Sequence, residues 1–420
     1  MVYEMTSTSD RLPSQLPLEL WREVVRYAFT SISVPKPPAE KSLNWKGDHD
    51  NIYPQSRGTS IKPIYSLARV SYQLWDISSE YLYSNLSLND AEQVNIIVSS
   101  PLLLEAVTRW AQQIDISPSF PDETGHSIFH STLAQFAEGT AHILGLCTRL
   151  HTVKIRIDAV SKRHTEMDQW RRIYRVIPPG VHNLDLDNGI CAASEWEPTH
   201  LLLSKRDDSL RSLRIAAAEN TSDFSFPKLT HLNLYSWKVA TNWSIPKLRE
   251  LFVIYLPNFR SVNTFWLHPR PTLEHLHFGH ATDLSTFPNL ALQIQSLAPN
   301  LVTFEYYYYG VEEMSWNPKD LPKSLKCVVI KLFHHWNKPG SSSSGLRLMS
   351  AEEGSENVLS LSMQQRWATF VRHVIGYNTD VQIDVIFPHG VSPQHVADVV
   401  GPALQESKVN VRFFESVEES

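Results

Sequence analysis

The sequence has little of the material on which most phosphate, redox and membrane sites depend. Glycine accounts for only 15 of the 420 residues, and no phosphate-cradling or dinucleotide-binding glycine motif is present. Neither the G-x-S-x-G of a nucleophile elbow nor the H-E-x-x-H of a zinc protease occurs. No apolar run approaches the roughly 20 residues that a membrane-spanning helix needs. We therefore expect no cofactor and no membrane partner.

Cysteine is also scarce, and basic charge is not in excess. The three cysteines, Cys147, Cys191 and Cys327, are odd in number and far apart, which fits a reducing compartment and predicts no disulfide or zinc framework. The 38 basic and 44 acidic residues are well mixed, with a net charge of −6, so we expect no nucleic-acid partner. The polar start, MVYEMTSTSDR, is not a secretory signal. The predicted location is cytoplasmic or nuclear, and residues 1–11 are expected to form a disordered tail.

What the sequence does contain is apolar periodicity, beginning with two segments near the N-terminus. In Leu16–Phe29, Pro17 suits a helix entry, and apolar residues recur at a helical spacing from Leu20 to Ala28. Residues 64–88 predict a second amphipathic helix through Leu67, Val70, Leu74, Trp75 and Ile77 and a third short helix beginning at Tyr81.

The two segments together, Leu-Pro-x-Glu-Leu-Trp and then Ser66, Leu67, Val70, Ser71, Trp75, Leu82 and Tyr83, resemble the F-box in the form common among fungal F-box-like proteins. The family's helical module docks on the Skp adaptor of cullin–RING ubiquitin ligases. Ordinary F-boxes are compact, whereas here a polar, proline-containing run at 34–63 separates the helices and is expected to form a long loop. The alternative is an N-terminal domain of simply capped helices. The resemblance implies a module at 12–88 whose docking face comprises Leu16, Pro17, Leu18, Leu20, Trp21, Val24, Leu67, Val70, Trp75, Leu82 and Tyr83.

A second pattern repeats through the middle of the chain. Segments of the form L-x-x-L-x-L start at Leu150, Val181, Leu210, Leu229, Leu248, Leu273, Leu301 and Leu325, and Trp110–Ile116 is a looser first member. The mean step is about 25 residues, which is inside the period of leucine-rich repeats. Two alternating side chains share one face of a short strand, and such units must stack into a parallel sheet to bury it. The alternative is a set of unrelated strands in an α/β domain.

The predicted fold class is therefore α/β: an N-terminal helical F-box-like module followed by an irregular leucine-rich-repeat solenoid with a parallel sheet. We place the solenoid at 89–335, with helices at 131–146, 165–176 and 284–297 and loops or single turns in the short steps around Pro227 and Pro246. A Gly/Ser-rich flexible loop is expected at 336–360. Residues 361–414 are expected to form a C-terminal repeat or cap, with a helix, a strand, a helix and a last strand.

The residues between the core positions of each strand would lie on the concave face of such a solenoid, where partners commonly bind. From this face we take Arg156, Arg214, His231, Tyr235, Phe252, His275 and Tyr307 as substrate-binding candidates, with Tyr235, Phe252 and Tyr307 as exposed aromatic anchors. Lys154, Asp185, Asp187, Asn233, Glu250, His277 and Glu305 share the face. Mixed charge and aromatic rings suit a protein or peptide better than a polyanion.

These patterns lead to three functional hypotheses. The first is a non-catalytic adaptor that binds Skp and the cullin ligase core through the N-terminal helices and an unknown protein substrate through the solenoid. The second is a repeat-based interaction scaffold with no ligase association. The third is a metal-dependent enzyme, because His275 and His277 share a strand face and can chelate as a pair. A third and fourth ligand at matching spacing are missing, so we predict no metal and no enzyme activity.

Overall fold

A computed structural model gives the fold of the chain. It describes residues 20–23, 72–118, 126–156, 167–191, 196–205, 208–217, 223–236, 240, 242–256, 269–280, 282, 284, 287, 289–308, 317–332, 361–387 and 393–415. The chain divides into two compact units, Met1–Lys46 with Ile52–Val181 and Gly47–Asn51 with His182–Ser420. Each unit is a mixed α/β body in which the strands are parallel and follow one another in chain order.

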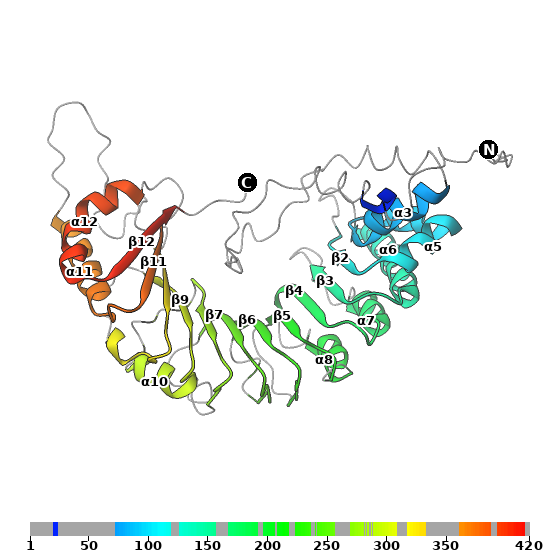
Figure 1. Cartoon of the computed structure of the whole chain (residues 1–420). Coiled ribbons are helices and arrows are strands. Elements are labelled where there is room, and N and C mark those ends of the chain that lie inside the picture. Colours follow the sequence, from blue (N-terminus) through cyan, green and yellow to red (C-terminus); the bar gives the residue numbers. More distant parts are fainter. Residues whose placement is uncertain are drawn as a thin grey trace. The chain divides into compact units, whose positions relative to one another are not determined.

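The first unit alternates helices with short strands (Figure 1). Its strands pair β1 with β2 and β2 with β3, and the register aligns Leu86 with Ile114 and Ile114 with Val153. Side chains on the helix-covered side, such as Ile114 and Ile155, are completely buried. The elements are α3 (Tyr72–Tyr83), β1 (Asn85–Leu88), α4 (Ala91–Ser99), α5 (Pro101–Trp110), β2 (Gln113–Ile116), α6 (His126–Leu146), β3 (Thr152–Arg156) and α7 (Met167–Val176).

Local sequence sets the helix starts in this unit. The Asp90 carboxylate accepts the backbone N–H of Gln93, and the Gln93 amide oxygen accepts the N–H of Asn89, so α4 begins with a reciprocal cap. Ser100 then caps α5, whose first residue is Pro101. Proline is favoured there because its missing N–H would have no helical acceptor. Ser100 is thus the single residue between the end of α4 at Ser99 and the start of α5 at Pro101.

The second unit contains further repeats, each with one parallel strand (Figure 1). The helices α10, α11 and α12 lie on one side of its strands. The elements are β4 (Asn183–Cys191), α8 (Trp196–Ser204), β5 (Ser212–Ala217), β6 (His231–Ser236), β7 (Glu250–Tyr255), β8 (His275–Phe278), α10 (Leu290–Leu297), β9 (Thr303–Tyr308), the 3-10 turn η7 (Pro318–Asp320), β10 (Cys327–Leu332), α11 (Leu361–Ile375), β11 (Gln382–Phe387), α12 (Pro393–Ser407) and β12 (Asn410–Glu415).

Each leucine of the repeat pattern has a fixed place in this unit. The two core positions of successive strands lie in register, so Leu232 is aligned with Leu251 and Leu251 with Leu276. The leading leucines, such as Leu248 and Leu273, lie below the strands and are completely buried. The core is thus a stack of aligned apolar layers. Each layer is covered by side chains of the next repeat rather than by side chains of its own repeat.

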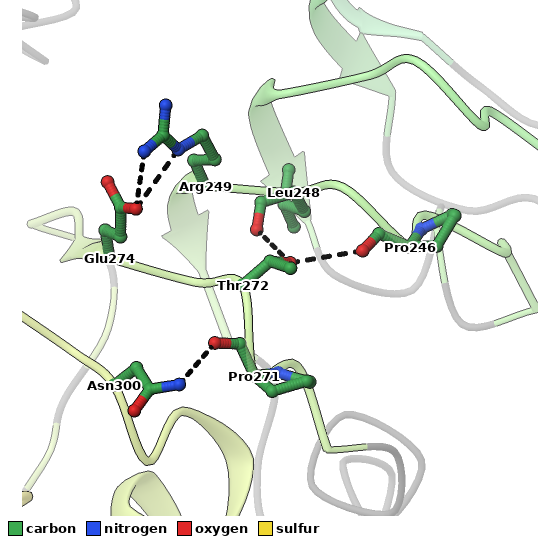
Figure 2. A network of polar contacts seen from close by, with 7 residues as sticks. All are labelled: Pro246, Leu248, Arg249, Pro271, Thr272, Glu274 and Asn300. Atoms are coloured by element: carbon green, nitrogen blue, oxygen red, sulfur yellow. Dashed lines mark hydrogen bonds and ion pairs between the residues drawn. The ribbon is translucent and has the colours of Figure 1, made fainter.

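Polar contacts between the turns that precede the strands hold successive repeats together. The backbone N–H groups of Glu274 and His275 both donate to the carbonyl of Arg249, and the same pattern recurs one repeat later at Val302 and Thr303. Figure 2 shows the side chains that reinforce these turns. The Thr272 hydroxyl donates to the carbonyls of Leu248 and Pro246 at 2.8 and 3.2 Å. The Asn300 amide donates to the carbonyl of Pro271, and Arg249 pairs with Glu274.

The two shortest repeats replace the helix by extended chain, as the prolines at 227 and 246 predict. Ser225 and Ser244 form an isolated parallel bridge below β5 to β7. The ring of Trp243 meets the rings of Phe224 and Phe226 edge-on, with centroids 5.5 and 5.2 Å apart. These aromatic rings fill the layer that a helix fills elsewhere, so the shorter step still buries its apolar face.

The solenoid predicted from the leucine pattern is confirmed in its elements: all eight L-x-x-L-x-L segments end in strands β3 to β10, and the looser first member ends in β2. The predicted helices at 131–146 and 165–176 correspond to α6 and α7, and 361–414 forms α11, β11, α12 and β12.

Two predictions near the N-terminus are wrong. Residues 72–83 form one helix rather than two, and the sheet begins with β1 at Asn85, before the predicted boundary at 89. The predicted tail, the 34–63 insertion and the 336–360 loop lie outside the described residues.

We expect Gly279→Ala to destabilise the second unit. Gly279 follows β8, and a Cβ there would lie 2.6 Å from the Cα of Ile254 in β7. Because backbone cannot move aside cheaply, the free energy of unfolding should fall by about 2 kcal/mol. Urea unfolding followed by circular dichroism measures this. The matched control is Gly401→Ala in α12, where an added Cβ meets nothing within 4 Å. That variant should be neutral or slightly stabilised, and equal losses in both would contradict the steric argument.

Candidate functional site

The candidate site is the sheet face of the second unit that lies opposite the core, which we call the polar face. Strand register arranges its side chains in rows that run across the strands. The first row contains Asn183, Ser212, His231, Glu250, His275, Thr303, Cys327, Gln382 and Asn410. The second row contains Asp185, Arg214, Asn233, Phe252, His277, Glu305, Val329, Asp384 and Arg412.

Five ionisable side chains from consecutive strands β6 to β10 form a chain of contacts across this face, which we call the charge ladder. Its members are His231, Glu250, His277, Glu305 and Lys331. His277 Nδ1 lies 3.1 Å from Glu305 Oε2, and Lys331 Nζ lies 2.6 Å from Glu305 Oε1. Glu250 lies between two histidines, with His231 Nε2 at 3.6 Å and His277 Nε2 at 3.9 Å. Carboxylates therefore alternate with basic side chains along the ladder.

Glu305 is the best-satisfied member of the ladder. Burial by itself raises the pKa of this carboxyl group, but the charge of Lys331 and the contact with His277 outweigh burial and lower the pKa to about 2. Glu305 is therefore ionised at neutral pH. Its ion pair with Lys331 is largely removed from water, because both side chains are mostly buried. Such a pair is costly to break from one side, since the remaining charge stays buried.

Glu250 is buried but less well satisfied. It is 5% exposed, and its Oε2 atom has no hydrogen-bond partner among the described contacts. The neighbouring His231 is half-exposed and shares its other ring nitrogen with the hydroxyl of Thr230 at 2.8 Å. Burial lowers the pKa of His275, the next first-row residue, while the charge of Glu250 opposes that effect. His231 and His275 thus present accessible imidazoles on either side of a buried carboxylate.

Further ion pairs lie on the faces of both units. In the second unit, Arg412 donates two hydrogen bonds to Asp384 at 2.8 and 2.7 Å, and Arg214 Nη1 lies 3.7 Å from Asp185 Oδ2. In the first unit, Arg156 Nη2 lies 3.2 Å from Asp115 Oδ2. Burial raises the pKa of Asp115, against the opposing charges of Arg156 and Lys154. The predicted candidate Arg156 is therefore already paired within its own sheet.

Apart from Arg156 in the first unit, the predicted substrate-binding residues share one face of the second unit, but not all are exposed. His231, Tyr235 and His275 are half-buried, and Arg214 is buried. The prediction that Phe252 and Tyr307 are exposed anchors is wrong, because they are only 3% and 7% exposed. His277 lies beside the ring of Phe252, and Lys331 Nζ lies 5.6 Å from the ring centroid of Tyr307. Neighbouring strands thus supply side chains that cover these rings.

The predicted Skp-docking face is described in part. Leu20 and Trp21 lie in a helical turn at 20–23, with Leu20 47% exposed. Trp75 and Tyr83 meet edge-on within α3, and Tyr83 is buried. This contact assigns Tyr83 to the internal packing of the unit, while Leu82 is half-exposed. The remaining candidates, Leu16, Pro17, Leu18, Val24, Leu67 and Val70, lie outside the described residues.

The polar face offers no arrangement that points to metal chemistry. Among the described residues, no group of three or more histidine, cysteine, aspartate or glutamate side chains is placed to hold a metal ion. His277 uses its ring nitrogens toward Glu305 and Glu250. Within the same part of the chain, no helix is both long and apolar enough to cross a bilayer.

Comparisons with known proteins add little to this geometry. No family model and no curated protein matches the chain. A crystal structure of a Bacteroides fragilis protein from a structural-genomics consortium is similar over 78% of this chain and 70% of its own, with a TM-score of 0.31 and 12% sequence identity. Likeness at that level carries no argument. The description of the chain as a repeat protein rests on its own strands and register.

Sequence analysis missed several members of the polar face. Lys331, Asp384 and Arg412 were not among the candidates. Lys331 lies in register with Tyr307, and Asp384 and Arg412 continue the row that contains Glu305. The signal was available, since the alternation of apolar and polar residues in 327–332, 382–387 and 410–415 continues the repeat pattern. Continuing the count of face positions through β10, β11 and β12 would have found all three.

We expect Lys331→Met to reduce the free energy of unfolding by about 3 kcal/mol at pH 7, because it leaves the Glu305 charge buried without its strongest partner. The pKa of Glu305 in the folded chain, about 2, is below its ordinary value of 4.5. Its stabilising contribution is therefore complete above that ordinary value and is lost as pH falls toward 2. The difference between wild type and Lys331→Met should shrink over this interval. Urea titrations at several pH values test both statements.

The double variant Glu305→Gln/Lys331→Met is the control for this prediction. It removes the unpaired charge and should recover most of the lost stability. If it were no more stable than Lys331→Met alone, Lys331 would stabilise the chain through its contact with the Tyr307 ring and not through Glu305.

Proposed function

We propose that the polar face of the second unit binds a protein partner without catalysis. The observation that carries this proposal is the charge ladder, in which side chains from β6 to β10 hold one another in fixed positions. Such pre-ordered groups lose little side-chain entropy on binding. The half-exposed imidazoles of His231 and His275 lie beside buried Glu250 and supply polar contact points. The His231 ring is already held by contacts with Thr230 and Glu250.

The charge distribution favours a protein over a nucleic acid as this partner. Nucleic-acid interfaces neutralise phosphates with a surplus of lysine and arginine. On the polar face, Asp185, Glu250, Glu305 and Asp384 alternate with basic side chains that they already pair. Among the described residues of this face, Arg214, Lys331 and Arg412 are each already paired with a carboxylate, so a polyanion would have to compete with these carboxylates. Mixed polar groups of this kind are typical of protein recognition.

We further propose that the chain is the substrate-recognition adaptor of an SCF-type ubiquitin ligase, acting in the cytoplasm or nucleus. The support is the paired N-terminal sequence pattern from Leu16 to Trp21 and from Ser66 to Tyr83. In this proposal the N-terminal helices dock on Skp and the second unit holds the substrate. The adaptor's contribution to catalysis is proximity, because holding a substrate lysine near the charged conjugating enzyme raises its effective concentration.

The alternative is an interaction scaffold with no ligase association. The polar insertion at 34–63, with its prolines, favours this alternative because it separates two helices that are contiguous in ordinary F-boxes. The two functions share the binding role of the polar face and differ only in the N-terminal module. An assay for Skp binding therefore separates them without knowledge of the substrate.

We expect recombinant Skp to co-purify with the full chain and to be lost on Pro17→Ala/Trp21→Ala, because both side chains belong to the implied docking face. Thermal unfolding of the second unit should be unchanged in this variant. The matched control is Trp367→Phe in α11, which conserves an aromatic ring far along the sequence. If Skp fails to bind the unmutated chain at micromolar concentration, the adaptor role is wrong and the scaffold alternative remains.

Substrate binding by the polar face, if it occurs as proposed, predicts that a variant of this face loses the native partner. His231→Glu/His275→Glu places two carboxylates beside Glu250 at half-exposed positions and should abolish most contacts with the native partner. Quantitative proximity labelling in cells, with Gln295→Glu on the exposed side of α10 as the control, measures this. Proteins labelled by wild type and by the control but not by the double variant are the substrate candidates. Identical labelling by all three chains would exclude this face.

A further inference from the structure

Strand β12 lies at one end of the sheet in the part of the chain that the structure describes. β12 pairs with β11 along one edge, and no strand among the described residues lies along its other edge. Val411 and Phe413 occupy core positions in register with Ile383 and Val385. Ile383 and Val385 are completely buried, whereas Val411 and Phe413 are only half-buried. The apolar layer of the core therefore ends on a partly exposed surface.

Helix α12 extends this apolar surface above the strand. Val396, Val400 and Leu404 are buried and mark the side of α12 that faces the core. On one flank of that side, Ala397 and Gly401 are half-buried, as expected for the flank shielded by the neighbouring α11. On the other flank, Val399 and Ala403 are exposed. At 100° per residue, Val399 and Ala403 lie on the flank of α12 opposite to Ala397 and Gly401.

Open strand edges and uncapped repeat ends promote association unless they are blocked. Natural sheets block them with proline, inward-pointing charge or a covering loop. In β12 the core-facing positions hold Val411, Phe413 and, at the last residue of the strand, Glu415, which is aligned with Phe387. The inward-facing charge is thus confined to the end of the strand, which contains no proline. The arrangement therefore favours addition of a further strand that brings apolar residues to the core side and polar residues to the other side.

We propose that this further strand is β12 of a second copy of the chain, paired antiparallel about a two-fold axis at Val411. In this register Val411 faces its own equivalent and Val409 faces Phe413 of the other copy, so the core-side pairs between residues 409 and 413 are apolar. Glu415 lies beyond this paired segment. On the opposite side, Asn410 faces Arg412 of the other copy. The amide oxygen of Asn410 is an acceptor for that guanidinium, which Asp384 already neutralises.

Neighbouring registers are less favourable, which makes this one specific. An axis at Asn410 would place Lys408 opposite Arg412 of the other copy. An axis at Arg412 would place the two guanidinium groups opposite each other, and like charges in that position are destabilising. An axis between residues would turn the core side of one copy against the polar side of the other. An axis at Phe413 would place Val411 opposite Glu415 of the other copy. Of the alignments centred on residues 410 to 413, only the one at Val411 avoids both opposed like charges and a charged residue opposite a core-side valine.

The proposed pairing has a consequence for partner binding. A two-fold axis perpendicular to the sheet keeps the polar faces of both copies on the same side. The dimer would therefore present two charge ladders to one multivalent partner or to two partners at once. Avidity can raise the affinity for a partner with two sites by orders of magnitude without any new contact.

Sedimentation velocity of the full chain tests the proposal, because it distinguishes a 48.0-kDa monomer from a species of twice that mass. We expect a dimer at tens of micromolar. Asn410→Asp should tighten it and Asn410→Arg should weaken it by about tenfold, since two Asn410–Arg412 pairs change in each dimer. Asn410→Asp removes the hydrogen bond that the Asn410 amide donates to Gln382, so a tighter dimer in this variant would arise in spite of that loss. Gln295→Arg on α10 adds the same charge elsewhere and should have no effect.

Oxidative cross-linking fixes the register. Val411→Cys should form a covalent dimer on non-reducing gels, because the two thiols face each other across the axis. Val409→Cys, which faces Phe413 of the other copy, should not exceed the wild-type background. A chain that stays monomeric at all concentrations would overturn the proposal, and so would a dimer insensitive to the Asn410 charge. Equal cross-linking by both cysteine variants would refute this register. None of these outcomes depends on Skp or on a substrate.

Discussion

The constraint on which this structure depends is that no repeat can bury its own apolar face. Each strand contributes two core side chains, and the layer is closed only when the next repeat places its own pair in register, as Leu232, Leu251 and Leu276 do. The carbonyl of one turn residue accepts two N–H groups from the following turn, which fixes that register. Everything on the opposite face follows from it, because side chains there are aligned as strictly as those in the core.

This alignment explains why charge alternates along the polar face. Side chains at the same position of adjacent strands are neighbours, so a row of like charges would be unstable, and the half-buried setting removes the water that would otherwise screen it. Glu305 illustrates the result: burial opposes its ionisation, yet Lys331 and His277 on the adjacent strands keep its pKa at about 2. The row is stable because its members are paired across strands rather than along the chain.

Much of this arrangement could be predicted from the sequence. The parts that could not be predicted share one cause. The strand positions follow from the leucine spacing, which is local information. The burial of Phe252 and Tyr307 depends on His277 and Lys331, which lie one repeat further along the chain. The first strand, Asn85–Leu88, lacks the leading leucine of the pattern and was assigned to the helical module. Cross-strand coverage and irregular first repeats are set by packing that local patterns do not encode.

The same constraint separates the residues that hold the fold from those available to a partner. Second-row side chains such as Glu305 and Asp384 are committed to pairs within the sheet, and displacing them would leave a buried charge. First-row positions are less committed, because His231 lies 3.6 Å from Glu250 and both His231 and His275 remain half-exposed. In the proposed binding role, selectivity therefore belongs to the first row, and the second row supplies rigidity.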